Sequence, residues 1–146
     1  MTLLLFASLL VSRFLLSSAA PASNEPQSVT VTVSSLVSAT STVKLYFYNT
    51  REGFLKSGKW AFSKSVKPTG KNGFTLPVEL PKGEWAVAIT QDLNNNGKVD
   101  KNFLGIPTEP YAFSNNVRPT VSAPRFDECK FMVDGPGKVV SIVLKD

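Results

Sequence analysis

The 146-residue sequence contains no histidine and only one cysteine, Cys129. Without an imidazole, the chain has no Ser-His-Asp or Cys-His catalytic arrangement and no histidine-ligated zinc site. A single cysteine also excludes an internal disulfide framework and a cysteine-based metal cluster. Cys129 alternates with Phe131 and Val133, so we predict that its thiol is a small buried group in a strand.

Acidic residues are few as well, with 11 Asp and Glu against 16 Lys and Arg and a formal net charge of +5. The basic residues are scattered and form no run interleaved with aromatics, so we expect no nucleic-acid partner. No glycine-rich loop joins a strand to a helix, which leaves nucleotide binding without support. A Ser-Lys pair or a pair of carboxylates stays open as hydrolytic chemistry, but no motif singles out either.

Residues 1–22 are typical of a secretory signal peptide. The apolar run at 3–16 is too short to span a bilayer and is interrupted by Arg13, and the A-x-A form of residues 20–22 predicts cleavage after Ala22. No Lys or Arg precedes the run, and an uncleaved anchor or a buried N-terminal helix is the alternative. We therefore expect a secreted or periplasmic protein, without membrane attachment after cleavage, whose residues 23–146 form one domain.

Short segments of alternating polarity, rich in β-branched and aromatic residues, predict about seven strands. They lie at residues 29–33, 43–48, 60–66, 74–80, 85–90, 129–133 and 139–144, separated by Gly- and Pro-rich turns. Pro77 predicts that its segment is an edge strand. The pattern favours an all-β fold, an antiparallel β-sandwich of the immunoglobulin-like or transthyretin-like kind, with a small closed barrel as the alternative. In the segment at 85–90, Ala86 and Ala88 share one face, which predicts that another layer or loop approaches there.

The best strand candidate leads directly into residues 92–100, which read D-x-N-x-N-G-x-x-D. This oxygen-rich loop matches the first nine positions of an EF-hand-type calcium loop, including the glycine at position 6. The predicted Ca²⁺ ligands are Asp92, Asn94, Asn96 and Asp100 through side chains and Lys98 through its carbonyl. Position 12, which usually holds a bidentate Glu, is Phe103, so we name Glu109 as the replacement carboxylate.

So few carboxylates predict weak affinity, with a dissociation constant of ~10⁻⁴–10⁻³ M. The alternative is a polar turn in which Asp and Asn side chains bond their own backbone.

Residues 103–116 have no helical or strand period but carry several aromatics. We expect Phe103 and Phe113 to pack onto one end of the sandwich, because such a long apolar loop would otherwise be exposed. Tyr111, Asn115, Asn116 and Arg118 combine aromatic and polar groups of the kind that bind carbohydrate or protein.

Several motifs occur together and in order along the chain: YFY at 46–48, EGF at 52–54, LPKGEWAV at 80–87, the oxygen-rich loop, NFLGIP at 102–107 and EPYAFSNN at 109–116. The series resembles the domain of unknown function 2141 family of exported, mostly bacterial proteins. The resemblance implies a compact β-sandwich and no established activity. The chain departs from the family pattern at Gln91, where His is frequent, and at Ala112, where Gly is usual, and the first departure weakens any catalytic or transition-metal site.

The sequence thus predicts an exported, non-enzymatic β-sandwich whose calcium loop shapes the adjacent interaction loop. A small extracellular hydrolase that uses Asp or Glu side chains, or a structural component of a surface assembly, is the alternative.

Overall fold

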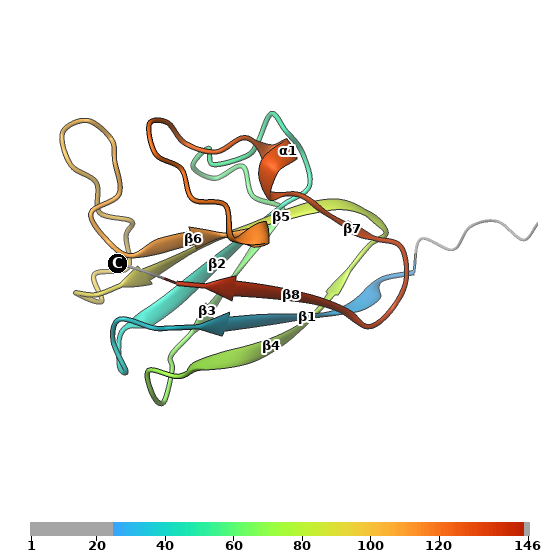
Figure 1. Ribbon diagram of the computed structural model, residues 1–146, viewed down its shortest axis with the longest axis horizontal. Coiled ribbons are helices and arrows are strands. Elements are labelled where there is room, and N and C mark those ends of the chain that lie inside the picture. Colours follow the sequence, from blue (N-terminus) through green and yellow to red (C-terminus); the bar gives the residue numbers. More distant parts are fainter. Residues whose placement is uncertain (1–24, 145–146) are drawn as a thin grey trace, which may run out of the picture.

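The computed structural model describes residues 25–144, which form eight strands in two facing sheets (Figure 1). One sheet has the order β4-β1-β8, with β4 at Gly73–Leu80, β1 at Gln27–Ser34 and β8 at Lys138–Val143. The other has the order β3-β2-β5-β6, at Phe62–Val66, Thr42–Tyr48, Gly83–Asp92 and Tyr111–Phe113. A further strand, β7 at Phe131–Val133, pairs with the start of β5. The all-β, sandwich-type prediction is therefore confirmed.

Alternating apolar residues of both sheets meet between the layers. Their side chains exclude water from one continuous core, since each strand turns every second residue inward. This inner core contains Val29, Val31, Val33, Val43, Leu45, Phe47, Trp85, Val87, Ile89, Val140 and Ile142. The large apolar residues at alternating positions of the segments at residues 29–33, 43–48 and 85–90 therefore face this core. Trp60, at the start of the segment predicted at 60–66, lies outside β3 and packs instead against a second apolar cluster.

Strand pairing is antiparallel with one exception among the described residues, the parallel pair β1–β8. β4 lies at the edge of its sheet, as Pro77 predicted, and Pro77 stands opposite Thr30 of β1 with its ring exposed. A proline is tolerated there because the outer side of the strand has no partner that needs its N–H.

The face of β5 that carries alanines is covered, as those small residues predicted. Phe54, Phe126 and Cys129 pack on Ala86 and Ala88 in a second apolar cluster on the outer side of the larger sheet. Cys129 is fully buried, as expected. It does not begin a strand, however, but ends the single-turn helix α1 (Phe126–Cys129), so that part of the strand prediction was wrong.

Two predictions for residues 103–116 need correction. Phe103 does not pack onto the sandwich, because its side chain is 94% exposed at the tip of a loop, whereas Phe113 is buried as expected. The segment is also not wholly irregular: residues 111–113 form β6, and the 3-10 turn η1 (Ser114–Asn116) follows directly. A three-residue strand is too short to produce an alternation that a sequence pattern can reveal.

The signal-peptide prediction concerns residues 1–22, which lie outside the described residues. Among residues 25–144 no helix has the length and apolar character needed to cross a membrane.

Candidate functional site

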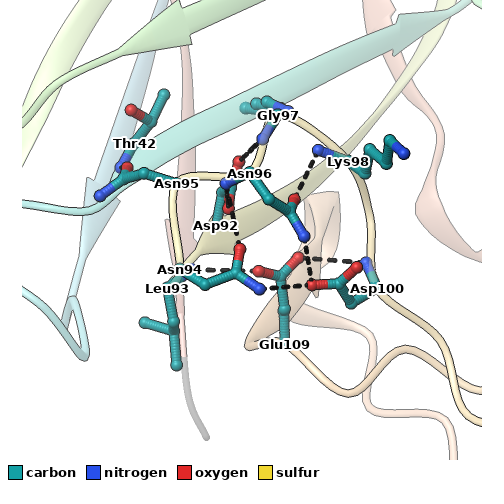
Figure 2. Close-up of polar contacts among 11 residues, drawn as sticks. Thr42, Asp92, Leu93, Asn94, Asn95, Asn96, Gly97, Lys98, Asp100 and Glu109 are labelled. Carbon is teal, nitrogen blue, oxygen red and sulfur yellow. Dashed lines mark hydrogen bonds and ion pairs between the residues drawn. The ribbon is translucent and has the colours of Figure 1, made fainter.

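The oxygen-rich loop begins where β5 leaves the core, and the strand fixes its first residue. Asp92 is 1% exposed, and its carboxylate accepts hydrogen bonds from the backbone N–H groups of Asn96 (3.1 Å) and Gly97 (2.8 Å) (Figure 2). The Lys44 ammonium lies 3.4 Å from the same carboxylate. Gly97 takes a positive φ of 82°, a backbone conformation that glycine adopts without a steric penalty.

These contacts determine the charge state of Asp92. Burial by itself raises the pKa of a carboxyl, but the N–H groups of Gly97 and Asn96 and the Lys44 ammonium outweigh it and hold the pKa of Asp92 below its usual value. Asp92 is therefore an anion throughout the physiological range, as a metal ligand has to be.

The second half of the loop converges on Asp100. The amide nitrogens of Asn94 and Asn96 both donate to Asp100 Oδ2, at 2.7 and 2.8 Å (Figure 2). The amide oxygens accept backbone N–H bonds in turn, Asn94 Oδ1 from Asn96 (3.1 Å) and Asn96 Oδ1 from Lys98 (2.8 Å). The side chains of Asn94, Asn96 and Asp100, at positions 3, 5 and 9 of the motif, thus lie against one another.

Glu109 lies against the oxygen-rich loop, although it is not part of the motif and follows Asp100 by 9 residues. Its Oε1 accepts the N–H of Leu93 at 3.0 Å and its Oε2 that of Asp100 at 3.3 Å, so one carboxylate joins both ends of the loop. The Glu109 side chain is buried, which raises its pKa, and the charges of Asp92 and Asp100 raise it further, against the lowering effect of the two N–H bonds. Three carboxylates therefore share a small, partly buried region.

The donor set suits a hard cation, because every candidate ligand atom is an oxygen. Within residues 25–144, no three His, Cys, Asp or Glu side chains alone form a group that could hold a metal. Amide and carbonyl oxygens would have to complete the coordination. A half-turn of the Asn94 and Asn96 amides would place oxygen in place of nitrogen beside Asp100, where a cation could bind it. The same half-turn would give up the backbone N–H bonds that the two amide oxygens accept, so the cation would have to compensate for these as well. The Lys98 carbonyl remains a predicted ligand.

The four residues predicted to bind a ligand do not form one group. The amide of Asn115 donates to the carbonyls of Glu128 and Lys130, at 3.0 and 2.8 Å. The Asn116 amide donates to the Ser141 carbonyl and accepts the N–H of Val143, both in β8. Arg118 donates to the Val143 carbonyl at 2.6 Å. These three side chains attach their segment to α1 and β8. Tyr111 instead lies on the outer face of β6, where its ring meets that of Phe113 at 5.7 Å.

Tyr111 lines a cleft that the sequence did not predict. An outer-face cleft of about 880 Å³ lies over β2, β5 and β6, between the loops at residues 97–107 and 119–124. Tyr46 and Trp60 line it, and their rings lie 4.9 Å apart. Tyr46 lies on the face of β2 opposite the core residues Leu45 and Phe47, but only the loops that rise around that face turn it into a cleft.

Gln91 has a structural position. It follows Trp85, Val87 and Ile89 on the inner face of β5 and is 0% exposed. Its Oε1 accepts the N–H groups of Val37 (2.9 Å) and Ser38 (3.2 Å). The residue therefore points away from the outer-face cleft, toward the loop between β1 and β2.

The family model described as an uncharacterized protein conserved in bacteria, domain of unknown function 2141, matches residues 31–141. The match covers most of the chain, from β1 into β8, so the chain belongs to this family, as its motifs suggested. No curated protein and no solved structure matches the chain.

Proposed function

We propose that this chain is an exported, non-enzymatic module in which the oxygen-rich loop and Glu109 bind Ca²⁺ and thereby give the adjacent loop at residues 101–110 its shape. The observation that carries the proposal is the position of Glu109, whose buried carboxylate bonds the backbone at Leu93 and at Asp100. It supplies the carboxylate that position 12 of the motif lacks. Glu109 also connects the oxygen-rich loop to the next strand, because it lies just before β6, which begins at Tyr111.

Electrostatics favours a cation at this place. Asp92, Asp100 and Glu109 lie together, and Lys44 is the only ammonium that contacts them among the described ion pairs. A divalent cation would offset the charges of Asp92 and Asp100, which add to the effect of burial in raising the pKa of Glu109. Side-chain oxygens of Asp92, Asn94, Asn96, Asp100 and Glu109, with the Lys98 carbonyl, approach the about six to eight ligands that Ca²⁺ takes.

The test is thermal unfolding of the purified protein with 10 mM CaCl₂ and with chelator, using Asp100→Asn as the main variant. Asp100→Asn leaves an oxygen to accept the two Asn amides but removes a charged ligand. For a dissociation constant near ~1 mM, 10 mM Ca²⁺ stabilises the wild type by about 1.4 kcal/mol, which raises the midpoint by roughly 4–8 °C. We expect this shift to vanish in Asp100→Asn and in Asp92→Ala.

Asp134→Asn is the matched control, because Asp134 is exposed in the turn between β7 and β8. It should retain the full shift. A wild-type midpoint that is the same with Ca²⁺ and with chelator would refute the metal site and leave the loop as a polar turn.

The hydrolase alternative has no observation in its favour. Asp92 and Glu109 each use both carboxylate oxygens as acceptors for backbone N–H groups. A glycan-cleaving activity that disappears in Glu109→Gln, with the fold intact, would nevertheless favour the enzyme. Self-association without any ligand would favour the surface-assembly alternative.

A further inference from the structure

We infer that the outer-face cleft is a binding site for an acidic saccharide, a short glycan whose sugar units carry carboxylates. The cleft has a volume of about 880 Å³, which is in the range of ligand sites. Its floor is the outer face of β2, β5 and β6, and its walls are two loops that stand on the same side of the larger sheet (Figure 1). Three properties of its lining determine the ligand class.

The first is a buried hydroxyl without a partner. Thr90 lies on the floor of the cleft, between Lys44 of β2 and Tyr111 of β6 in the strand register. The residue is 8% exposed, and its Oγ1 has no hydrogen-bond partner within residues 25–144. A buried hydroxyl without a partner is costly, and a hydroxyl both donates and accepts. A polyhydroxylated ligand offers the matching group.

The second property is the set of half-buried aromatic rings. Tyr46 and Trp60 lie 4.9 Å apart with their planes at 53°, and Tyr111 stands on the neighbouring strand at the same floor. Rings that keep one face free offer large apolar area while their polar ends still form hydrogen bonds. The C–H faces of a sugar ring pack on such rings, and sugar hydroxyls meet the phenol and indole groups.

The third property is the charge. Lys56, Lys98 and Lys101 reach the cleft from two different loops, and no Asp or Glu among residues 25–144 lines it. Outside the lining, the carboxylates of Asp92 and Glu109 add to burial in raising the pKa of Tyr46 on the floor. All three lysines are exposed. A cleft lined by charges of one sign attracts ligands of the opposite sign, so a neutral glycan would leave this feature unused. The carboxylates of an acidic saccharide are the complementary groups.

The rim carries apolar side chains, which makes an amphipathic lipid the competing ligand. Leu104 is 68% exposed, Ile106 50% and Val121 97%. They lie at the loop tips, whereas the unpartnered hydroxyl and the aromatic rings lie on the floor, where the ligand must fit. A fatty-acid chain would place methylene groups against Thr90 and leave its hydroxyl without a partner.

The inference rests on the proposed function in one respect: the wall at residues 97–107 belongs to the segment that Ca²⁺ is proposed to hold. The two proposals are nevertheless separable, because one predicts a change of the unfolding midpoint with Ca²⁺ and the other predicts heat of saccharide binding.

The test is isothermal titration calorimetry of the purified protein in 1 mM CaCl₂. The probes are trigalacturonate and its neutral counterpart galactotriose, with sodium decanoate as the lipid probe. We expect trigalacturonate to bind, galactotriose to bind at least about tenfold more weakly, and the difference to shrink as NaCl rises. Lys56→Gln, Lys98→Gln and Lys101→Gln, combined, should remove the preference for the acidic probe.

Thr90→Val is the most informative variant, since it removes only the hydroxyl while it keeps the shape. We expect an affinity for trigalacturonate about 2- to 10-fold lower, the effect of one lost hydrogen bond, with an unfolding midpoint at or above that of the wild type. Thr32→Val on β1, in the other sheet, is the matched control and should bind like the wild type. Trp60→Ala should lower the affinity without abolishing the calcium-dependent shift of the midpoint.

The outcomes that would overturn the inference are distinct. Absence of trigalacturonate binding to a protein that shows the calcium shift refutes the saccharide site and leaves the metal proposal intact. Equal binding of both saccharides refutes the acidic class, and binding of decanoate alone assigns the cleft to a lipid. Unchanged affinity in Thr90→Val refutes the role of the hydroxyl. Saccharide binding without a calcium shift of the midpoint supports the cleft and refutes the metal site.

Discussion

Replacing Gln91 by Leu should destabilise the protein more than most single substitutions, although Leu is apolar and of similar size. Gln91 is fully buried and makes four hydrogen bonds to the loop between β1 and β2. Its Oε1 accepts from the N–H groups of Val37 and Ser38, and its Nε2 donates to the carbonyls of Ser38 (2.7 Å) and Ser41 (3.3 Å). Leucine keeps the volume and removes all four bonds.

The expected loss follows from the two N–H donors that are left without an acceptor. Each unsatisfied, partly buried donor costs about 1–3 kcal/mol, which gives about 2–6 kcal/mol for Val37 and Ser38 together. The apolar side chain of Leu gains roughly 1 kcal/mol from burial, so we expect a net loss of about 1–5 kcal/mol. Against a total stability of about 5–15 kcal/mol, this is a large fraction.

The assay is equilibrium unfolding in urea. The free energies of unfolding are compared between variants whose unfolding free energy depends on the urea concentration with the same slope. Gln27→Leu at the start of β1 is the control, because within residues 25–144 the Gln27 amide bonds only the nearby Glu25 carbonyl, and its change should stay within about 0.5 kcal/mol. Gln91→His, which offers one acceptor and one donor, should fall in between. If Gln91→Leu unfolds with a free energy within about 0.5 kcal/mol of the wild type, the argument from the four bonds is wrong.

Two further predictions concern groups that the proposed functions do not use. The Cys129 thiol, whose pKa burial and the nearby Glu128 carboxylate raise to about 12, should resist alkylation at pH 8 in the folded protein and react in urea. Rapid labelling of the native protein would contradict its burial. Burial, with a contribution from Tyr46, raises the pKa of Tyr48 to about 12, so the folded state keeps the phenol proton that the unfolded state loses near pH 10. Stability that is complete below about pH 10 should therefore fall by roughly 2–3 kcal/mol toward pH 12, and Tyr48→Phe should remove most of that slope when urea unfolding is measured at several pH values; equal slopes would refute the assignment.

The sequence alone determined the properties that depend on neighbouring residues. Alternation assigned the inward faces of β1, β2 and β5, because successive side chains of a strand point to opposite faces. Pro77 indicated an edge strand because it lacks an N–H, and the alanines of β5 indicated a covering layer because small side chains leave room for one. Within the oxygen-rich loop, the bonds of Asn94 and Asn96 were also predictable from the motif, since they reach residues only two to six positions away. The contact of Asp92 with Lys44 of β2 was not.

Tertiary structure decided what depends on residues that are distant in the chain. Glu109 was named only as a candidate, and its place at Leu93 and Asp100 requires the chain to return after a loop of exposed apolar residues. The path of this loop leaves Phe103 exposed to solvent, whereas Phe113 is buried. No local sequence pattern distinguishes the two phenylalanines.

The amides of Asn115 and Asn116 are engaged with α1 and β8 because η1 packs beside those elements, and not because of any motif. The outer-face cleft, with Thr90 on its floor, exists only because loops from separate parts of the chain rise on one side of the same sheet. A one-dimensional pattern records which residues face outward, whereas the register and the loop paths determine which of them come together.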